Sequence, residues 1–132
     1  MPQPFSGGQP MPFEIVREAN LIRATFVGIV TNEDLLQIGR AAAETEDSYS
    51  RIPPRVVDLS QSEGLNLSFQ GILGLAQARR SRTFGNPFRS ALVASNDAQL
   101  GFARMFQTLM DHPQVTIRIF GDLAGAEAWL AE

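Results

Sequence analysis

The segment that decides the fold is Arg55–Gly74, which reads RVVDLSQSEGLNLSFQGILG. Its short apolar run, 56–59, is typical of a buried strand. A polar loop follows and leads to Ser68, where a helix over 68–82 is predicted to begin. A strand followed by a loop and a helix is the repeating unit of a parallel α/β sheet.

The same unit recurs on both sides of this segment. The β-rich runs 13–18 and 21–28 predict an antiparallel hairpin. Strands are also predicted over 90–95 and 115–120, and helices over 31–46 and 122–130. A third helix, between those two strands, is predicted to begin with Asn96 or Asp97 as its cap and to be closed by His112-Pro113. The predicted order is therefore ββαβαβαβα, an α/β domain with a mixed, mostly parallel sheet of about five strands and with four helices.

The starts and buried faces of two helices follow from their residue types. Thr31 and Asp34 have the spacing of a capping box at the start of the first helix. The second helix is expected to bury a stripe made of Phe69, Ile72, Leu73 and Ala76. In the third helix the apolar side is either core, the wall of an apolar pocket or a dimer face, and its residues are Phe102, Phe106, Leu109 and Met110.

Length and composition indicate one globular domain. The chain has 132 residues, of which 44% are apolar and 19% charged. We expect residues 1–12, rich in Pro, Gly and Gln, to be a flexible tail rather than a signal peptide, and residues 13–132 to be the domain. The net charge of −3 gives no general attraction to nucleic acid, and no apolar run is long enough to predict membrane insertion.

The residue inventory excludes several kinds of chemistry. With no cysteine there is no disulfide, thiolate metal site or cysteine nucleophile, and a cytoplasmic location fits this composition. All eleven basic residues are arginine, so no lysine is available for a Schiff base or a phosphate loop. The single histidine, His112, lies at a predicted helix end and is expected to act as a cap. We therefore expect no catalytic residue, no metal and no cofactor, and a protein that is not an enzyme.

The order of elements resembles that of the STAS, or anti-sigma-factor antagonist, superfamily. The segment RVVDLS, the loop and the helix that opens near a serine with GILG carry this resemblance. A closer likeness is to the SpoIIAA-like branch of small stand-alone bacterial domains, and it rests on LGFARMFQTL (100–109) and VTIRIFGDLAGAEAWL (115–130). The resemblance covers about residues 13–132 and also extends to the larger Sec14-type lipid carriers.

This resemblance implies a phosphorylation switch. In STAS antagonists a partner kinase phosphorylates a serine at the start of the second helix, usually in an Asp-Ser-Ser-Gly setting, and Ser68 best matches that position. Here the serine lies in Asn66-Leu67-Ser68-Phe69-Gln70-Gly71, without the preceding acid and the adjacent glycine. The residues of the candidate partner or ligand loop are Asp58, Ser60, Ser62, Asn66, Phe69, Asn96 and Asp97.

Purely local roles also explain these residues. Ser68 is a suitable N-cap, and Asp58 is able to accept hydrogen bonds from loop amides as an Asx turn. If a phosphate were added to Ser68, it would change the charge by about −1.5 to −2 and repel an acidic partner.

Arg79, Arg80 and Arg82, with Arg89 nearby, form the main basic cluster and are candidate anion-binding residues. The alternative is that these cations only complement the dipole at a helix C-terminus.

Two functions from different classes follow. The first is a non-enzymatic, STAS-like regulatory module that binds a protein partner, either a regulator or a kinase, or self-associates as a dimer. The second is a Sec14-like carrier or sensor of a small apolar or anionic ligand.

Overall fold

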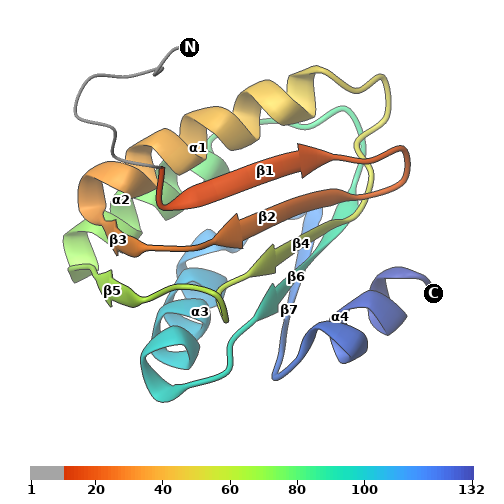
Figure 1. Ribbon diagram of the computed structural model, residues 1–132. Helices are drawn as coiled ribbons and strands as arrows, with labels where there is room; N and C mark the ends of the chain where they lie inside the picture. Colours follow the sequence, from red (N-terminus) through yellow and green to blue (C-terminus); the bar gives the residue numbers. More distant parts are fainter. Residues whose placement is uncertain (1–10) are drawn as a thin grey trace, which may run out of the picture.

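The computed structural model in Figure 1 describes residues 11–132 and is built around one five-stranded sheet. The strand order across the sheet is β1-β2-β4-β6-β7. These strands are β1 (Phe13–Arg17), β2 (Ile22–Phe26), β4 (Arg55–Asp58), β6 (Phe88–Val93) and β7 (Val115–Phe120). The helices are α1 (Asn32–Asp47), α2 (Phe69–Arg80), α3 (Asp97–Met110) and α4 (Leu123–Leu130).

The sheet is mixed in the way that the sequence predicts. β1 pairs with β2 antiparallel, while the pairs β2–β4, β4–β6 and β6–β7 are parallel. Each parallel connection runs through a helix, since neighbouring parallel strands need a long crossover. The predicted α/β class, the mixed five-stranded sheet and the four helices are confirmed.

The helices cover the two faces of the sheet unequally (Figure 1). α1, α2 and α3 pack on one face, where Leu35, Leu75 and Phe102 share a core cluster with Phe26 of β2. α4 packs on the other face, and Trp129 lies in a second cluster with residues of β4 and β6. Because neighbouring side chains of a strand point to opposite faces, successive residues of β6 enter different cores.

A small parallel sheet of two strands lies beside the main sheet and was not predicted. It consists of β3 (Ile29–Thr31) and β5 (Gly64–Asn66), with Ile29 opposite Gly64. Each strand has three residues, too few to show a period-two pattern in the sequence. Val30, which is fully buried, anchors this pair in the core.

The caps of α1 and α2 are as predicted, but the buried stripe of α2 is wrong at its first residue. Thr31 and Asp34 form the capping box of α1, and Ser68 is the N-cap of α2. Phe69, the first residue of α2, is 50% exposed, because no preceding helical turn covers it. Leu73 is half-buried, and the buried residues of α2 are Ile72, Leu75, Ala76 and Arg79.

The predicted tail, residues 1–12, lies mostly outside the described residues. Within the described part, the Pro12 carbonyl accepts a hydrogen bond of 2.8 Å from the backbone N–H of Val27. None of the helices among residues 11–132 combines the length and the apolar character that crossing a membrane requires.

Candidate functional site

The carboxyl ends of the parallel strands and the starts of all four helices meet at one end of the molecule, which we call the loop end (Figure 1). Asp58 ends β4, and its Oδ1 accepts hydrogen bonds from the Ser60 backbone N–H (2.9 Å) and hydroxyl (2.6 Å). This is the Asx-turn arrangement, so the buried Asp58 carboxylate serves the loop itself.

Ser68 joins the starts of two helices. Its hydroxyl oxygen accepts from the Gly71 N–H (3.1 Å) and from Nδ2 of Asn32 (3.0 Å), the first residue of α1. In return, the backbone N–H of Ser68 donates to Oδ1 of Asn32 over 3.1 Å. The Ser68 side chain is nevertheless exposed, as are Asn66 and Phe69 on either side of it.

A third helix start is tied to the same loop by Gln99, which the sequence did not single out. Asn96 caps α3 by accepting from the Gln99 N–H (2.9 Å), while Asp97 is exposed beside it. Nε2 of the buried Gln99 donates to the Ser62 hydroxyl over 3.3 Å. The predicted loop residues therefore do lie at one end, although most of their hydrogen bonds are internal to the loops.

Three large apolar side chains at the loop end are exposed. Ile29 is 59% exposed, Leu36 is 55% exposed and Phe69 is 50% exposed. Leu36 lies one turn after Asn32, on the same side of α1. Asn32 is hydrogen-bonded to Ser68, the residue before Phe69. Leu36 and Phe69 are therefore both close in sequence to the hydrogen bond that joins the starts of α1 and α2. Large apolar side chains that gather at one exposed place mark an interaction surface.

The loop end is also strongly acidic. Segments 27–36, 58–71, 95–99 and 120–122 contain six carboxylates and no arginine. Since the whole chain has 14 acids and 11 arginines, the rest of the molecule has eight acids and 11 arginines, a net charge of +3. None of the six forms a salt bridge with a residue in the range 11–132; they are Glu33, Asp34, Asp58, Glu63, Asp97 and Asp122.

A buried group of charges lies at the other end of the helix layer. Glu46 is 2% exposed and accepts from Arg55 Nη1 (2.6 Å) and Arg79 Nη1 (3.0 Å), and a second Arg79 nitrogen also pairs with it. Arg82 approaches Glu46 at 3.7 Å and pairs with the exposed Asp47 at 2.8 Å. Three guanidinium groups thus surround one buried carboxylate.

Burial and neighbouring charges both shift pKa values in this group. Burial raises the pKa of Glu46, but the Arg79 hydrogen bond and the Arg55 charge outweigh burial and hold that pKa below its ordinary value. Burial and the nearby Arg79 charge lower the pKa of Arg55 to about 10. Both groups remain charged at neutral pH.

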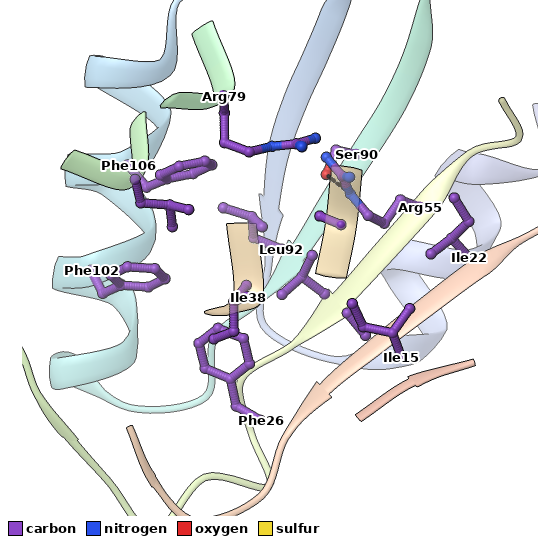
Figure 2. Close-up of a pocket in the computed structure, with 14 residues that line it drawn as sticks. Ile15, Ile22, Phe26, Ile38, Arg55, Arg79, Ser90, Leu92, Phe102 and Phe106 are labelled. Atoms are coloured by element: carbon purple, nitrogen blue, oxygen red, sulfur yellow. Dashed lines mark hydrogen bonds between the residues drawn. The ribbon is translucent and has the colours of Figure 1, made fainter. Parts of the chain in front are cut away.

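A cavity of about 60 Å³ adjoins these arginines, between the sheet and helices α1, α2 and α3. Figure 2 shows Arg55, Arg79 and Ser90 at one end of it and Phe26, Ile38 and Phe102 at the other. Its other lining residues are apolar: Ile15, Ile22, Ala24, Ala42, Val57, Leu75, Leu92 and Phe106.

The arginines of the predicted basic cluster lie in different surroundings. Arg79 is buried beside Glu46, whereas Arg80 is exposed and donates to the Leu109 carbonyl over 2.9 Å. Arg89 donates to the Trp129 carbonyl over 2.7 Å, on the other face of the sheet. Helical spacing separates Arg79 from Arg80, because adjacent residues point about 100° apart.

His112 has a structural position. Its Nδ1 accepts from the Gln114 N–H over 2.9 Å, and its Nε2 lies 2.7 Å from the Arg82 carbonyl oxygen. With Nδ1 as acceptor, Nε2 carries the proton and donates it to that carbonyl. Within residues 11–132, no group of three or more His, Asp or Glu side chains is arranged to hold a metal ion.

The comparisons with known proteins identify the fold. No protein-family model matches the sequence, and no curated protein matches it. Among solved structures, the chain is similar to an uncharacterised protein of the DUF3478 family from Shewanella loihica PV-4, which has a SpoIIAA-like fold. The TM-score is 0.57 at 20% sequence identity, and the match covers 89% of this chain and 91% of that chain. The domain therefore has a SpoIIAA-like fold, as the sequence resemblance indicated.

Glu46 and Arg55 were not predicted as site residues, although the sequence contains a signal for both. Glu46 continues the apolar stripe of α1 one turn after Ala42, and Arg55 opens an apolar strand. A charged residue at a position that the pattern predicts to be buried indicates a partner of opposite charge. The pattern does not show which residue that partner is, because Glu46 and Arg79 are 33 residues apart.

Proposed function

We propose that this protein is a non-enzymatic, STAS-like regulatory module that binds a protein partner through its loop end. The observation that carries the proposal is that three apolar side chains, Ile29, Leu36 and Phe69, are exposed at the loop end, where Ser68 is also exposed. Burying half-exposed side chains of this size against a partner is favourable by about 25 cal/mol per Å² of apolar area.

The charge of the loop end favours a basic partner. Its six carboxylates exceed the positive dipole charge of four helix N-termini, which is about +2 in total. A surface with this excess repels acidic partners even when Ser68 carries no phosphate. A phosphate on Ser68 would add negative charge, and we propose that it strengthens the attraction to a basic partner.

Phosphorylation would also act on the helix junction. The Ser68 oxygen accepts from Asn32 and from the Gly71 N–H, so a phosphate there changes contacts at the starts of both α1 and α2. Backbone N–H groups at a helix start favour a phosphate. In the proposed switch, the modification alters both the charge and the geometry of the docking surface.

A photo-crosslinking amino acid placed at residue 69 in the native cells tests this function. Val16 is the matched control, because it is an apolar residue of similar exposure, 47% against 50% for Phe69, on a strand away from the loop end. One protein crosslinked from residue 69 and not from residue 16 is the expected result. Equal crosslinking from both positions, or none from residue 69, contradicts the proposed surface. Intact mass and fragment mapping of the same protein test for phosphate at Ser68.

The second candidate is a binder of a small ligand, and the cavity beside Arg55 and Arg79 favours it. At about 60 Å³ the cavity has room for about four to six water-sized groups, far less than a lipid chain requires. The geometry thus favours a sensor of a small molecule over a lipid carrier. Extraction of native protein with organic solvent, followed by mass spectrometry, tests for a resident ligand.

The proposed place of action is the cytoplasm, where a regulatory partner would be met. Fractionation of the native cells, with immunodetection of the protein in each fraction, tests this location. Recovery mainly outside the cytoplasmic fraction contradicts it.

A further inference from the structure

The cavity beside the buried arginines has two chemically different ends. Eleven of its lining residues are apolar, and the polar ones are Arg55, Arg79 and Ser90, which lie together (Figure 2). Ser90 is 2% exposed and Arg55 is 8% exposed. An apolar space with one charged end suits an amphipathic guest rather than a purely apolar one.

Donor groups at the polar end remain unused. Nη1 of Arg55 donates to Glu46, and its Nε donates to the Ser90 hydroxyl oxygen over 3.3 Å. Among residues 11–132, Nη2 of Arg55 makes no hydrogen bond, and the Ser90 hydroxyl donates none. In contrast, both terminal nitrogens of Arg79 are engaged by Glu46. Two adjacent donors, one on a guanidinium and one on a hydroxyl, match the two oxygens of a carboxylate.

The local charge balance also favours an anion. Arg55, Arg79 and Arg82 face a single buried carboxylate, and the second acid, Asp47, has a side chain that is 70% exposed. Buried charges without a counter-charge are costly, and a bound anion would neutralise the excess. Burial and, after it, the Arg79 charge lower the pKa of Arg55.

We propose that the cavity binds a short-chain carboxylate, with its carboxylate on Arg55 Nη2 and the Ser90 hydroxyl and its alkyl chain toward Phe26 and Phe102. This inference rests on the second candidate function and names its ligand class. A cavity of about 60 Å³ accommodates about four to six non-hydrogen atoms, which corresponds to propionate, butyrate or isobutyrate. Longer fatty acids do not fit the cavity without rearrangement of the helices.

Titration of the full chain with sodium butyrate tests the proposal, with butyramide as the neutral analogue of the same size and sodium chloride as the ionic-strength control. Binding is measured by calorimetry and by the ¹⁵N signals of the arginine side chains. Butyrate is expected to bind saturably and at least tenfold more tightly than butyramide, and to shift the Arg55 Nε signal. Equal effects of butyrate and chloride would mean an adventitious ion only, and equal binding of butyramide would mean a plain apolar cavity; either result overturns the proposal.

Two variants and one control locate the site without removing an arginine. Ala42→Leu fills the cavity and is expected to weaken butyrate binding at least tenfold, whereas Ala78→Leu, at an exposed position of α2, leaves it unchanged within twofold. Ser90→Ala removes one donor and is expected to weaken binding about threefold to tenfold. Unchanged affinity in Ala42→Leu places the ligand elsewhere and contradicts the proposal.

The small-ligand function and the short-chain carboxylate as its ligand can be disproved separately. A resident molecule extracted from native protein, together with no binding of propionate, butyrate or isobutyrate, would overturn the ligand class and keep the small-ligand function. No extracted molecule and no binding would overturn both.

Discussion

At the scale of single residues, Glu46 is the side chain on which the helix layer depends most. It comes from the last turn of α1, and it holds Arg55 of β4 and Arg79 of α2, so one carboxylate joins three elements. Removing its charge would leave guanidinium groups buried without an opposite charge. The loss of one partner in a buried ion pair is far more costly than the pair itself is stabilising.

Glu46→Gln is therefore expected to lower the free energy of unfolding by about 3–5 kcal/mol. Urea denaturation followed by circular dichroism measures this change. Glu44→Gln, at an exposed position of the same helix, is the matched control and is expected to change stability by no more than about 0.5 kcal/mol. Equal effects of the two substitutions would show that the buried cluster has no special role.

At the scale of elements, the helix starts explain the polar residues between strand and helix. Asp58, Ser68 and Asn96 all accept hydrogen bonds from nearby backbone N–H groups, as the local interpretation of these residues expects. Ser68 has an additional contact with Asn32, so it also fixes α2 beside α1. A role in docking would use side chains that already have a structural role.

Replacement of Ser68 by alanine and by aspartate separates capping from signalling. Ser68→Ala is expected to cost about 1 kcal/mol through the lost N-cap, whereas Ser68→Asp retains an acceptor and stays within about 0.5 kcal/mol of the natural chain. Thermal and urea unfolding measure both, with the exposed Ser50→Ala as control. If partner binding follows the charge at residue 68 while stability follows the cap, Ser68 has both functions. A similar stability loss in both Ser68 variants would contradict the capping role.

Which side of α2 is buried can also be tested by substitution. Leu75 is 6% exposed, so Leu75→Ala is expected to cost about 2–5 kcal/mol through lost burial and a new cavity. Phe69 is 50% exposed, and Phe69→Ala is expected to cost about 1 kcal/mol or less. The reverse order in urea denaturation would support the predicted stripe over the observed one.

At the scale of the whole molecule, charge is distributed unevenly along the strand direction. The carboxylates of the loop end have no arginine among them, while a buried arginine cluster lies at the far end of α1 and α2. The two proposals use this distribution: a basic protein partner for the loop end, and a small anion for the cavity beside the arginine cluster.

Acid is expected to weaken the whole fold through Glu46. Because its pKa in the folded protein lies below the ordinary value of 4.5, the unfolded chain binds the proton first as pH falls. The stabilisation is fully present above pH 4.5 and is lost as pH falls from there through the lower pKa of the folded state. Urea denaturation at a series of pH values measures this loss, and Glu46→Gln should show a smaller one. Identical pH dependence in both proteins would exclude Glu46 as a cause.

The sequence by itself determined the order of the elements, the mixed sheet, the capping box at Thr31 and the N-cap at Ser68. These features depend on periodicity and on neighbours within four residues, which a single chain displays directly. The three-residue strands β3 and β5 could not be predicted from such local patterns, because their pairing joins Ile29 and Gly64, which are 35 positions apart. Only the tertiary structure decided that Phe69 is exposed and that Glu46 lies among Arg55, Arg79 and Arg82. Burial and ion pairing between distant segments depend on how the helices pack on the sheet, and local patterns do not encode that packing.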